Sequence, residues 1–234
     1  YQHFVIGGIR FCKEAILHNA AIQAIFINEE LLKQDFMREI LDHFFGRVLV
    51  CSKGLLEKHL STVNPQGIAA IIDIPEWNMD QLFISGTTFL ILDGVQDPGN
   101  LGTIIRTSLA AGVDAVFCLK GTVDVYNDKT LRSTMGAVFK LPVFYIQDTE
   151  ALIKKLQAQG IKLVLADVKA DLYHFQVEYP EKVALVLGSE ALGLQRITTG
   201  DYLVKIPLTP DSESLNVAIA GSIILYEIIR QRSL

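Results

Sequence analysis

The chain has 234 residues, half of them apolar, and a formal net charge of −5 at pH 7. This length and apolar content provide for one large domain or two ordinary ones. The acidic balance argues against nonspecific nucleic-acid binding through bulk charge, while leaving room for a local basic patch. The three cysteines, Cys12, Cys51 and Cys118, are widely spaced among apolar neighbours, and the histidines show no metal-ligand spacing. We therefore expect buried free thiols in a reducing cytoplasm and no metal site.

No secretory signal or membrane span is visible in the sequence. The longest apolar tract, 217–229, is interrupted by Gly221, Ser222 and Glu227, and we do not expect it to cross a membrane. The chain begins at Tyr1 without a methionine, and we expect the natural N-terminus to have been trimmed or to be disordered. Together these features favour a cytoplasmic protein.

Residues 1–76 alternate between helical and strand patterns. Their apolar residues either recur every three to four positions or form short continuous runs. They predict helices at 8–18, 29–45 and 53–60 and strands at 21–27, 47–51 and 67–74. This order indicates a small α/β domain of its own. Residues 77–86 mix Trp, Asn, Asp, Ser and Gly without a period, so we expect a linker there.

Residues 87–234 alternate in the same way and predict a second α/β domain with a parallel sheet. It opens with an apolar run at 89–92, an Asp-Pro-Gly-Asn turn at 97–100, an amphipathic helix and a strand at 113–119. Two strands joined by a helix should run parallel, with a right-handed connection. The remaining predictions are strands at 142–146, 162–166, 182–187 and 202–206, and helices at 125–139, 149–159 and 214–232.

Two polar residues of this opening unit are hard to explain by packing. Asn100 lies where the helix begins and where backbone N–H groups are free. Arg106 lies off the apolar face, and its side chain should lean toward the start of the helix, where Asn100 lies. The alternative is that Asn100 only caps the helix and Arg106 is a solvated charge. A nicotinamide site is not expected, because the dinucleotide-binding glycine pattern is missing.

Two later loops also follow predicted strands, where ligands bind in open α/β sheets. In the first, 187–194, Gly188 and Gly193 permit close backbone approach around the lone acid Glu190. The second, 206–216, offers Ser212 or Ser214 as a cap for the terminal helix, and Asn216 is a poor helix former that should have a partner. Each loop alone could equally be an ordinary connection.

The three segments together resemble the motifs of a known family. PGNLGTIIRT, LGSEALGL and IP(x)₆SLNVAIA, in this order and near the C-terminus, resemble the three motifs of the SpoU/TrmH-type RNA ribose 2′-O-methyltransferases of the SPOUT superfamily. The stretch RSTMGAVFKLPV is similar to the segment that lies between the first and second motifs of that family. GIRFCKEAI, near the start, is similar to its N-terminal RNA-binding domain, although this match is looser.

The resemblance implies a trefoil knot in the domain 87–234 and binding of S-adenosylmethionine by the knotted loops. It assigns two sets of residues in this sequence. The cofactor would be lined by Leu187, Gly188, Gly193, Ile206, Leu208 and Leu215. The reacting centre would be lined by Asn100, Arg106, Glu190, Ser214 and Asn216. The sequence departs from the family pattern at Ser189 and Ala191, where the second motif usually has Asn and Gly, and at Pro210, where the third often has Gly.

The implied reaction is methylation of a ribose 2′-hydroxyl in RNA, with ribosomal RNA favoured by the first domain. The alternatives are a transfer-RNA methyltransferase, a non-catalytic RNA-binding or ribosome-assembly factor on the same fold, and a methyltransferase acting on a small molecule or protein. The family proposal makes Arg106 the base. A guanidinium keeps its charge up to a pKa above about 12, so we prefer stabilisation of the developing alkoxide and a bidentate grip on a phosphate. Glu190 would hold Arg106 or the ribose.

The terminal helix predicts the oligomeric state. Apolar residues at 217–229 are spread almost all round it, and a helix of this kind must be buried on every side. One face can pack on its own sheet, and the other needs a partner. The resemblance supplies that partner as a second subunit, so we expect a homodimer.

Overall fold

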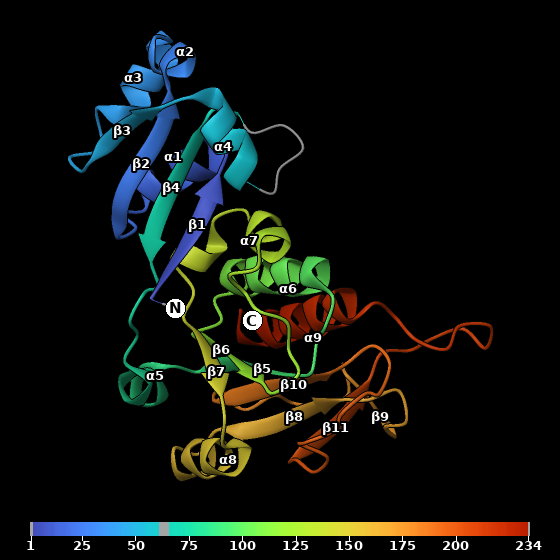
Figure 1. Ribbon diagram of the computed structural model, residues 1–234. Helices are drawn as coiled ribbons and strands as arrows, with labels where there is room; N and C mark the ends of the chain where they lie inside the picture. Colours follow the sequence, from blue (N-terminus) through green and yellow to red (C-terminus); the bar gives the residue numbers. More distant parts are fainter. Residues whose placement is uncertain (1, 61–65, 234) are drawn as a thin grey trace. The chain divides into compact units, whose positions relative to one another are not determined.

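The computed structural model describes residues 2–60 and 66–233, which divide into two compact units, Tyr1–Glu76 and Trp77–Leu234 (Figure 1). Tyr1, on which the expectation about the N-terminus rests, lies outside the described residues. The fold is α/β in both units, as predicted.

The first unit is built on a four-stranded mixed sheet in the order β1-β4-β2-β3. Its strands are β1 (His3–Gly7), β2 (Ile22–Asn28), β3 (Val48–Cys51) and β4 (Ile68–Asp73). Strand β4 runs antiparallel to both neighbours, and β2 and β3 run parallel. The edge strand β1 was not predicted. Its five residues are too few for the alternation of exposed and buried side chains to be recognised in the sequence.

Within residues 2–60 and 66–76, the three predicted helices of this unit become four. Helices α1 (Ile9–Leu17) and α4 (Lys53–His59) lie where they were expected. The single helix predicted at 29–45 is wrong, since the chain forms α2 (Glu29–Leu32) and α3 (Asp35–Leu41). Gln34 has an extended backbone that interrupts the helix, and Asn28 caps α2 by accepting the N–H of Leu31. Local capping overrides the apolar spacing here.

The second unit has a seven-stranded sheet in the order β7-β6-β5-β10-β8-β11-β9, with every neighbouring pair parallel. The predicted strands are found as β5 (Thr88–Asp93), β6 (Ala115–Leu119), β7 (Val143–Ile146), β8 (Lys162–Ala166), β10 (Val183–Gly188) and β11 (Tyr202–Lys205). The two-residue edge strand β9 (Leu172–Tyr173) was not predicted, and strands this short leave no periodic signal.

Helices cover both faces of this sheet. In Figure 1, α6 (Pro98–Ala110) and α9 (Val217–Arg232) lie on one face, and α8 (Thr149–Ala158) lies on the other. The helix predicted at 125–139 is shorter: α7 (Asp128–Thr134) ends where Met135 and Gly136 adopt positive φ, and a 3₁₀ turn, Ala137–Phe139, follows. Such backbone stops a helix.

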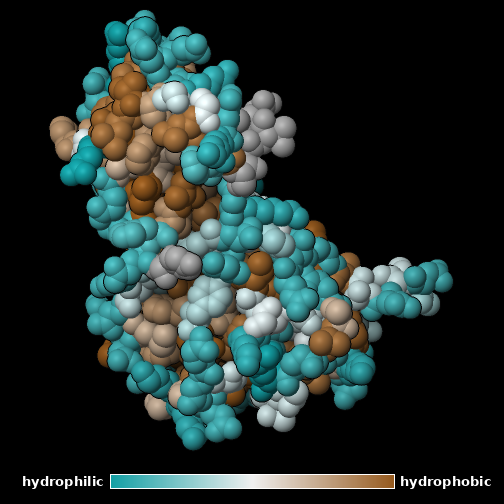
Figure 2. Space-filling model, viewed as in Figure 1, coloured by the Kyte–Doolittle hydropathy of each residue, from teal (hydrophilic) through white to brown (hydrophobic). Residues whose placement is uncertain are grey.

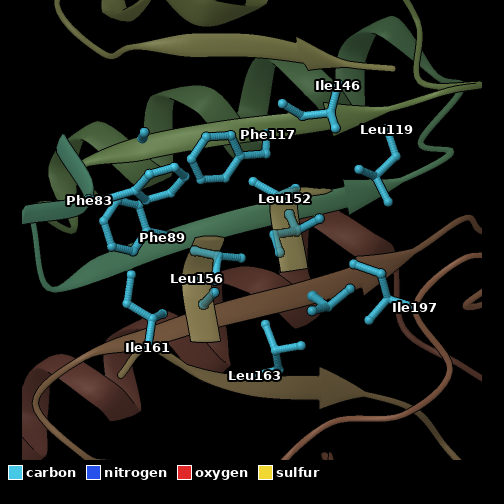
Figure 3. Packing of buried hydrophobic residues seen from close by; sticks show 14 of the residues in the cluster. Phe83, Phe89, Phe117, Leu119, Ile146, Leu152, Leu156, Ile161, Leu163 and Ile197 are labelled. Atoms are coloured by element: carbon cyan, nitrogen blue, oxygen red, sulfur yellow. The ribbon is translucent and has the colours of Figure 1, made fainter. Parts of the chain in front are cut away.

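The predicted linker is part of the second unit. Residues 77–86 contain α5 (Met79–Ser85), which Asn78 caps by accepting the N–H of Gln81. The buried ring of Phe83 lies 5.7 Å from that of Phe89 and 5.5 Å from that of Phe117, between ring centroids (Figure 3). Burying such a ring contributes roughly 1.5–3 kcal/mol. This aromatic anchor, which composition alone did not reveal, holds the segment on the sheet.

The cysteines only partly match the expectation of buried thiols. Burial raises the pKa of Cys12 to about 12, and burial together with the charge of Asp124 raises the pKa of Cys118 to about 12. Cys51 is only half-buried, because it lies on the edge strand β3. The two buried thiols stay protonated at neutral pH and are unsuited to nucleophilic chemistry.

Candidate active site

The mouth of α6 is capped by Asp97 and not by Asn100. The Asp97 carboxylate accepts the backbone N–H of Asn100 at 2.8 Å, and Pro98 occupies the first turn. This geometry removes the alternative in which Asn100 serves only as a cap, and it leaves the Asn100 amide available for other contacts.

Asn100 connects the other two predicted loops. The Asn216 Oδ1 accepts the N–H groups of Ala218 and Ile219 and so caps α9, which fixes its Nδ2 as a donor. That Nδ2 donates to the Asn100 Oδ1 at 2.8 Å, and the Asn100 Nδ2 donates to the Glu190 carboxylate at 2.6 Å. We call Asn216, Asn100 and Glu190 the amide relay. It aligns three segments that are far apart in the sequence, and it explains the partner expected for Asn216.

Helix α9 therefore starts three residues later than predicted. The serines proposed as caps, Ser212 and Ser214, precede it in an exposed loop, and the Ser212 hydroxyl donates to the Ser214 carbonyl at 3.4 Å. Asn216 has the extended backbone of a cap and accepts two N–H groups at once. A serine hydroxyl in the preceding loop does not reach them.

A buried carboxylate that the sequence reading missed fixes the second loop. Asp93, at the end of β5, is fully buried, and its Oδ2 accepts the N–H groups of Gln195 and Arg196, each at 2.6 Å. Its Oδ1 accepts from the Arg196 guanidinium at 3.0 Å. Asp93 thus holds the segment after Gly193 against β5. In the sequence, the available signal for Asp93 was a charged residue directly after the apolar run 89–92.

A cavity of about 380 Å³ lies at the carboxyl ends of β8, β10 and β11, closed by the start of α9. Its size falls in the range of small-molecule sites, roughly 300–1,000 Å³. All six residues predicted to bind the cofactor line it: Leu187, Gly188, Gly193, Ile206, Leu208 and Leu215. Of the five predicted at the reacting centre, Glu190, Ser214 and Asn216 line it.

Other lining residues escaped prediction. They come from the end of β8 and the segment that follows it, from β11 and from α9, and they include Ala166, Asp167, Val168, Lys205 and Ala220. The carboxyl end of β8 was a recognisable position, since ligands bind at that edge of parallel sheets. The residues of α9 could be assigned only once the helix was seen to close the cavity.

Arg106 is not brought to the cavity of its own chain. It is exposed on α6 and makes no hydrogen bond or ion pair with any residue that the structure describes. Six residues at about 100° each separate it from Asn100 by about 120° around the helix. The expected approach of the Arg106 side chain to Asn100 is therefore not found within one chain. Asn100 does not line the cavity, and only its hydrogen bonds to Glu190 and Asn216 connect it to the cavity wall.

The cavity suits a small organic ligand that has both apolar and polar parts. Leucine, isoleucine and alanine side chains provide apolar walls, and Glu190 and Asp167 provide carboxylates. At Gly188, an added Cβ would lie 2.3 Å from the Gly193 carbonyl carbon, so the loop closes tightly where its backbone faces the cavity. Within 2–60 and 66–233, no cluster of His, Cys, Asp and Glu could hold a metal ion. No described helix is long and apolar enough to span a membrane.

The fold and this site define an α/β protein that binds a small organic molecule at the carboxyl ends of its parallel strands. A model described as the SpoU rRNA Methylase family matches residues 87–226. A model described as RNA 2′-O ribose methyltransferase substrate binding matches residues 5–77. The chain therefore belongs to the SpoU methylase family and is an S-adenosylmethionine-dependent RNA ribose 2′-O-methyltransferase.

Individual relatives span nearly the whole chain. It is 32% identical over 228 residues to the 23S rRNA (guanosine(2553)-2′-O)-methyltransferase RlmP of Bacillus subtilis. The aligned region covers 96% of this chain and 88% of that protein. The S-adenosylmethionine complex of the SpoU methyltransferase AviRb from Streptomyces viridochromogenes has a TM-score of 0.90 at 26% identity, over 99% of this chain and 91% of that one. The S-adenosylmethionine-bound rRNA methyltransferase from Sinorhizobium meliloti has a TM-score of 0.85 at 28% identity, over 98% and 87%.

The tight closure at Gly188 yields a prediction. Gly188→Ala should weaken binding of S-adenosylmethionine about tenfold or more, because the new methyl group meets backbone atoms that cannot move aside without reshaping the loop. Calorimetry on the variant and on Gly54→Ala, where nothing lies within 4 Å of the added Cβ, measures the effect. Equal affinities in the two variants would contradict this account of the loop.

Proposed function

We propose that the chain methylates a ribose 2′-hydroxyl of ribosomal RNA, using the cavity for the cofactor and the amide relay to arrange the reacting centre. The observation that carries this proposal is the meeting of Asn100, Glu190 and Asn216 beside the cavity. Ribosomal RNA is supported as the substrate by the B. subtilis relative, which acts on 23S rRNA. Such an enzyme works in the cytoplasm.

The decisive experiment maps ribose methylation in ribosomal and transfer RNA from cells with and without the gene. We expect one ribosomal position to lose its methyl group in the deletion strain and to regain it on incubation with purified enzyme and S-adenosylmethionine. Loss of a transfer-RNA methyl group instead would redirect the proposal to transfer RNA.

Different residues of the chain would bind the cofactor and orient the ribose. Six residues of the cavity hold the cofactor, which when bound supplies an electrophilic methyl group. They are Leu187, Gly188, Gly193, Ile206, Leu208 and Leu215. The ribose hydroxyl is almost wholly protonated at neutral pH, so positioning and stabilisation of negative charge are the tasks left to the protein. In our proposal Glu190, held by Asn100, orients the ribose. Ser214 also lines the cavity.

We place Arg106 at the cavity of a partner subunit. Its guanidinium is exposed and unpaired among the described residues, and α6 packs against α9, the helix proposed for dimerisation. There it would stabilise the developing alkoxide and grip an RNA phosphate, for which the planar fork is suited. Mixed dimers of Arg106→Ala and Asn216→Ala subunits test this assignment. In the mixed dimer, the cavity of the Arg106→Ala subunit keeps its own Asn216 and receives Arg106 from its partner, so only the mixture contains one intact site.

Homodimerisation through α9 is supported by the helix surface. Most of α9 packs inside its own unit, but Ile219 and Tyr226 remain about half exposed, with Ile223 partly exposed between them. They recur at i, i+4 and i+7 and form one stripe. An apolar stripe on an otherwise packed helix is typical of a subunit interface.

A charge in this stripe should dissociate the dimer. Tyr226→Glu is expected to yield a monomer at micromolar concentration and to lower methylation, because it buries an unpaired carboxylate in the interface. Light scattering measures the mass, and Ile84→Glu, at an exposed position on α5, serves as the control. A dimeric Tyr226→Glu would move the interface away from α9.

The first unit, residues 1–76, would select the RNA and contribute no catalytic group. Its match to the substrate-binding family model supports this role. We also infer the trefoil knot for residues 87–234. The sheet order, in which β10 lies between β5 and β8 and β11 lies beyond β8, is compatible with it, and the high structural similarity to SpoU enzymes supports it.

A further inference from the structure

A partly exposed pair of rings lies at the edge of the second unit's sheet, on β9 and the turn after it. The rings of Tyr173 and Phe175 stack with centroids 5.4 Å apart and planes 12° from parallel. The Nζ of Lys205 lies 5.3 Å from the centroid of Tyr173. Phe175 is 51% exposed, so one of the stacked rings is open to a ligand. We call Tyr173, Phe175 and Lys205 the edge platform.

The backbone around the platform is held by several hydrogen bonds. Lys205 on β11 is the register partner of Tyr173 on β9, and the Lys205 carbonyl accepts the N–H of His174 at 2.8 Å. The Gln176 side chain accepts the N–H of Tyr173 at 2.8 Å. The Tyr179 hydroxyl donates to the His174 carbonyl at 2.7 Å. The rings are therefore presented by a fixed turn, which lowers the entropic cost of binding a ligand.

The platform adjoins the cofactor cavity through shared residues. Lys205 belongs to the platform and also lines the cavity. Val168, in the segment that leads into β9, lines the cavity as well and is 54% exposed. In Figure 1, β9 and β11 lie side by side at the edge of the sheet. A ligand on the platform would thus lie beside the cofactor cavity.

The chemistry of the platform points to one occupant. Stacked rings next to an ammonium group are the means by which proteins bind unpaired bases, with the cation free for a phosphate. Lys205 forms no ion pair with any residue in the described part of the chain, so its charge is available. A cation beside the rings favours a polyanion such as RNA over a protein partner. We propose that the edge platform stacks an unpaired base of the RNA substrate, near the nucleotide to be methylated.

This proposal rests on the proposed function and is tested on the full-length enzyme with Phe175→Ala, Phe175→Trp and Ile84→Ala. Ile84 is a matched exposed apolar residue on α5. Truncating one stacking ring should raise the Kd and the KM for ribosomal RNA from the deletion strain about tenfold, within the range measured for single stacked bases. Affinity for S-adenosylmethionine and the dimer mass should stay unchanged. Phe175→Trp should keep RNA binding, and Ile84→Ala should behave like the wild type.

Fluorescence supplies a readout specific to stacking. The chain has a single tryptophan, Trp77, so Phe175→Trp adds a reporter at the platform. Single-stranded oligoadenylate should quench Phe175→Trp more strongly than it quenches the wild type, and a fully paired RNA duplex should not. Unchanged RNA binding in Phe175→Ala, or equal quenching in both proteins, would overturn the proposal.

The remaining outcomes are also decisive. A Phe175→Ala protein that becomes monomeric would mark the platform as an interface between copies of the chain and overturn RNA stacking. Failure of the proposed function itself would show in the wild type, as no methyl transfer to ribosomal RNA. Failure of the platform alone would leave wild-type transfer intact, with no difference between Phe175→Ala and Ile84→Ala.

Discussion

Replacing Arg106 with alanine should slow methyl transfer by about 10²- to 10³-fold, the scale of removing one preorganised donor from a reacting centre. The affinity for S-adenosylmethionine should hardly change, because Arg106 does not line the cavity and the predicted cofactor contacts come from the other two loops. The exposed position of Arg106 on α6 also means that little folding stability is lost. The effect should therefore appear in the transfer rate.

Arg106→Lys should fail nearly as badly. An ammonium keeps the charge but loses the planar fork that can hold a phosphate through two parallel hydrogen bonds. Single-turnover methylation of the mapped RNA, beside calorimetry with S-adenosylmethionine, separates the rate from cofactor binding. Lys154→Ala, an exposed cation on α8, is the control. Wild-type rates in Arg106→Ala would show that this residue is only a surface charge and would contradict its proposed role in methyl transfer.

Asp93→Ala should destabilise the second unit by about 3 kcal/mol, the lower end of the cost of breaking a buried ion pair. The lower end applies because the Arg196 side chain is 36% exposed and can be partly hydrated once its partner is gone. The N–H groups of Gln195 and Arg196 would lose their acceptor in a part-buried position. At this chain length the melting temperature should fall by roughly 6–12 °C.

Hydrogen exchange gives the local test of this clamp. The amides of Gln195 and Arg196 should lose protection first in Asp93→Ala, and S-adenosylmethionine should bind more weakly because the second loop is no longer fixed. Asp93→Asn should also be destabilised, since an amide nitrogen cannot accept from these donors. Asp80→Ala removes an exposed partner of Lys155 and should cost less than about 1 kcal/mol. Unaltered exchange at residues 195 and 196 would refute the clamp.

The sequence by itself determined the fold class and the family, and it located the residues that line the cavity. Alternation of buried runs with helical spacing predicted six of the seven strands of the main sheet, because parallel strands covered on both faces are continuously apolar. Two of the three motifs supplied the six residues predicted to bind the cofactor, and all six line the cavity. Local competition caused the errors: capping by Asn28 and an extended Gln34 divided one predicted helix, and buried Phe83 made a core helix of the expected linker.

Only the tertiary structure decided how the loops cooperate. Asn100 and Asn216 lie 116 positions apart, and no local pattern could show that their amides meet, or that Asp97 and not Asn100 caps α6. Asp93 reaches the second loop across 102 positions, from a strand whose pattern reports only its burial. The platform of Tyr173, Phe175 and Lys205 exists because β9 pairs with β11. Spacing along the chain records local periodicity, whereas these contacts depend on which strands the sheet places side by side.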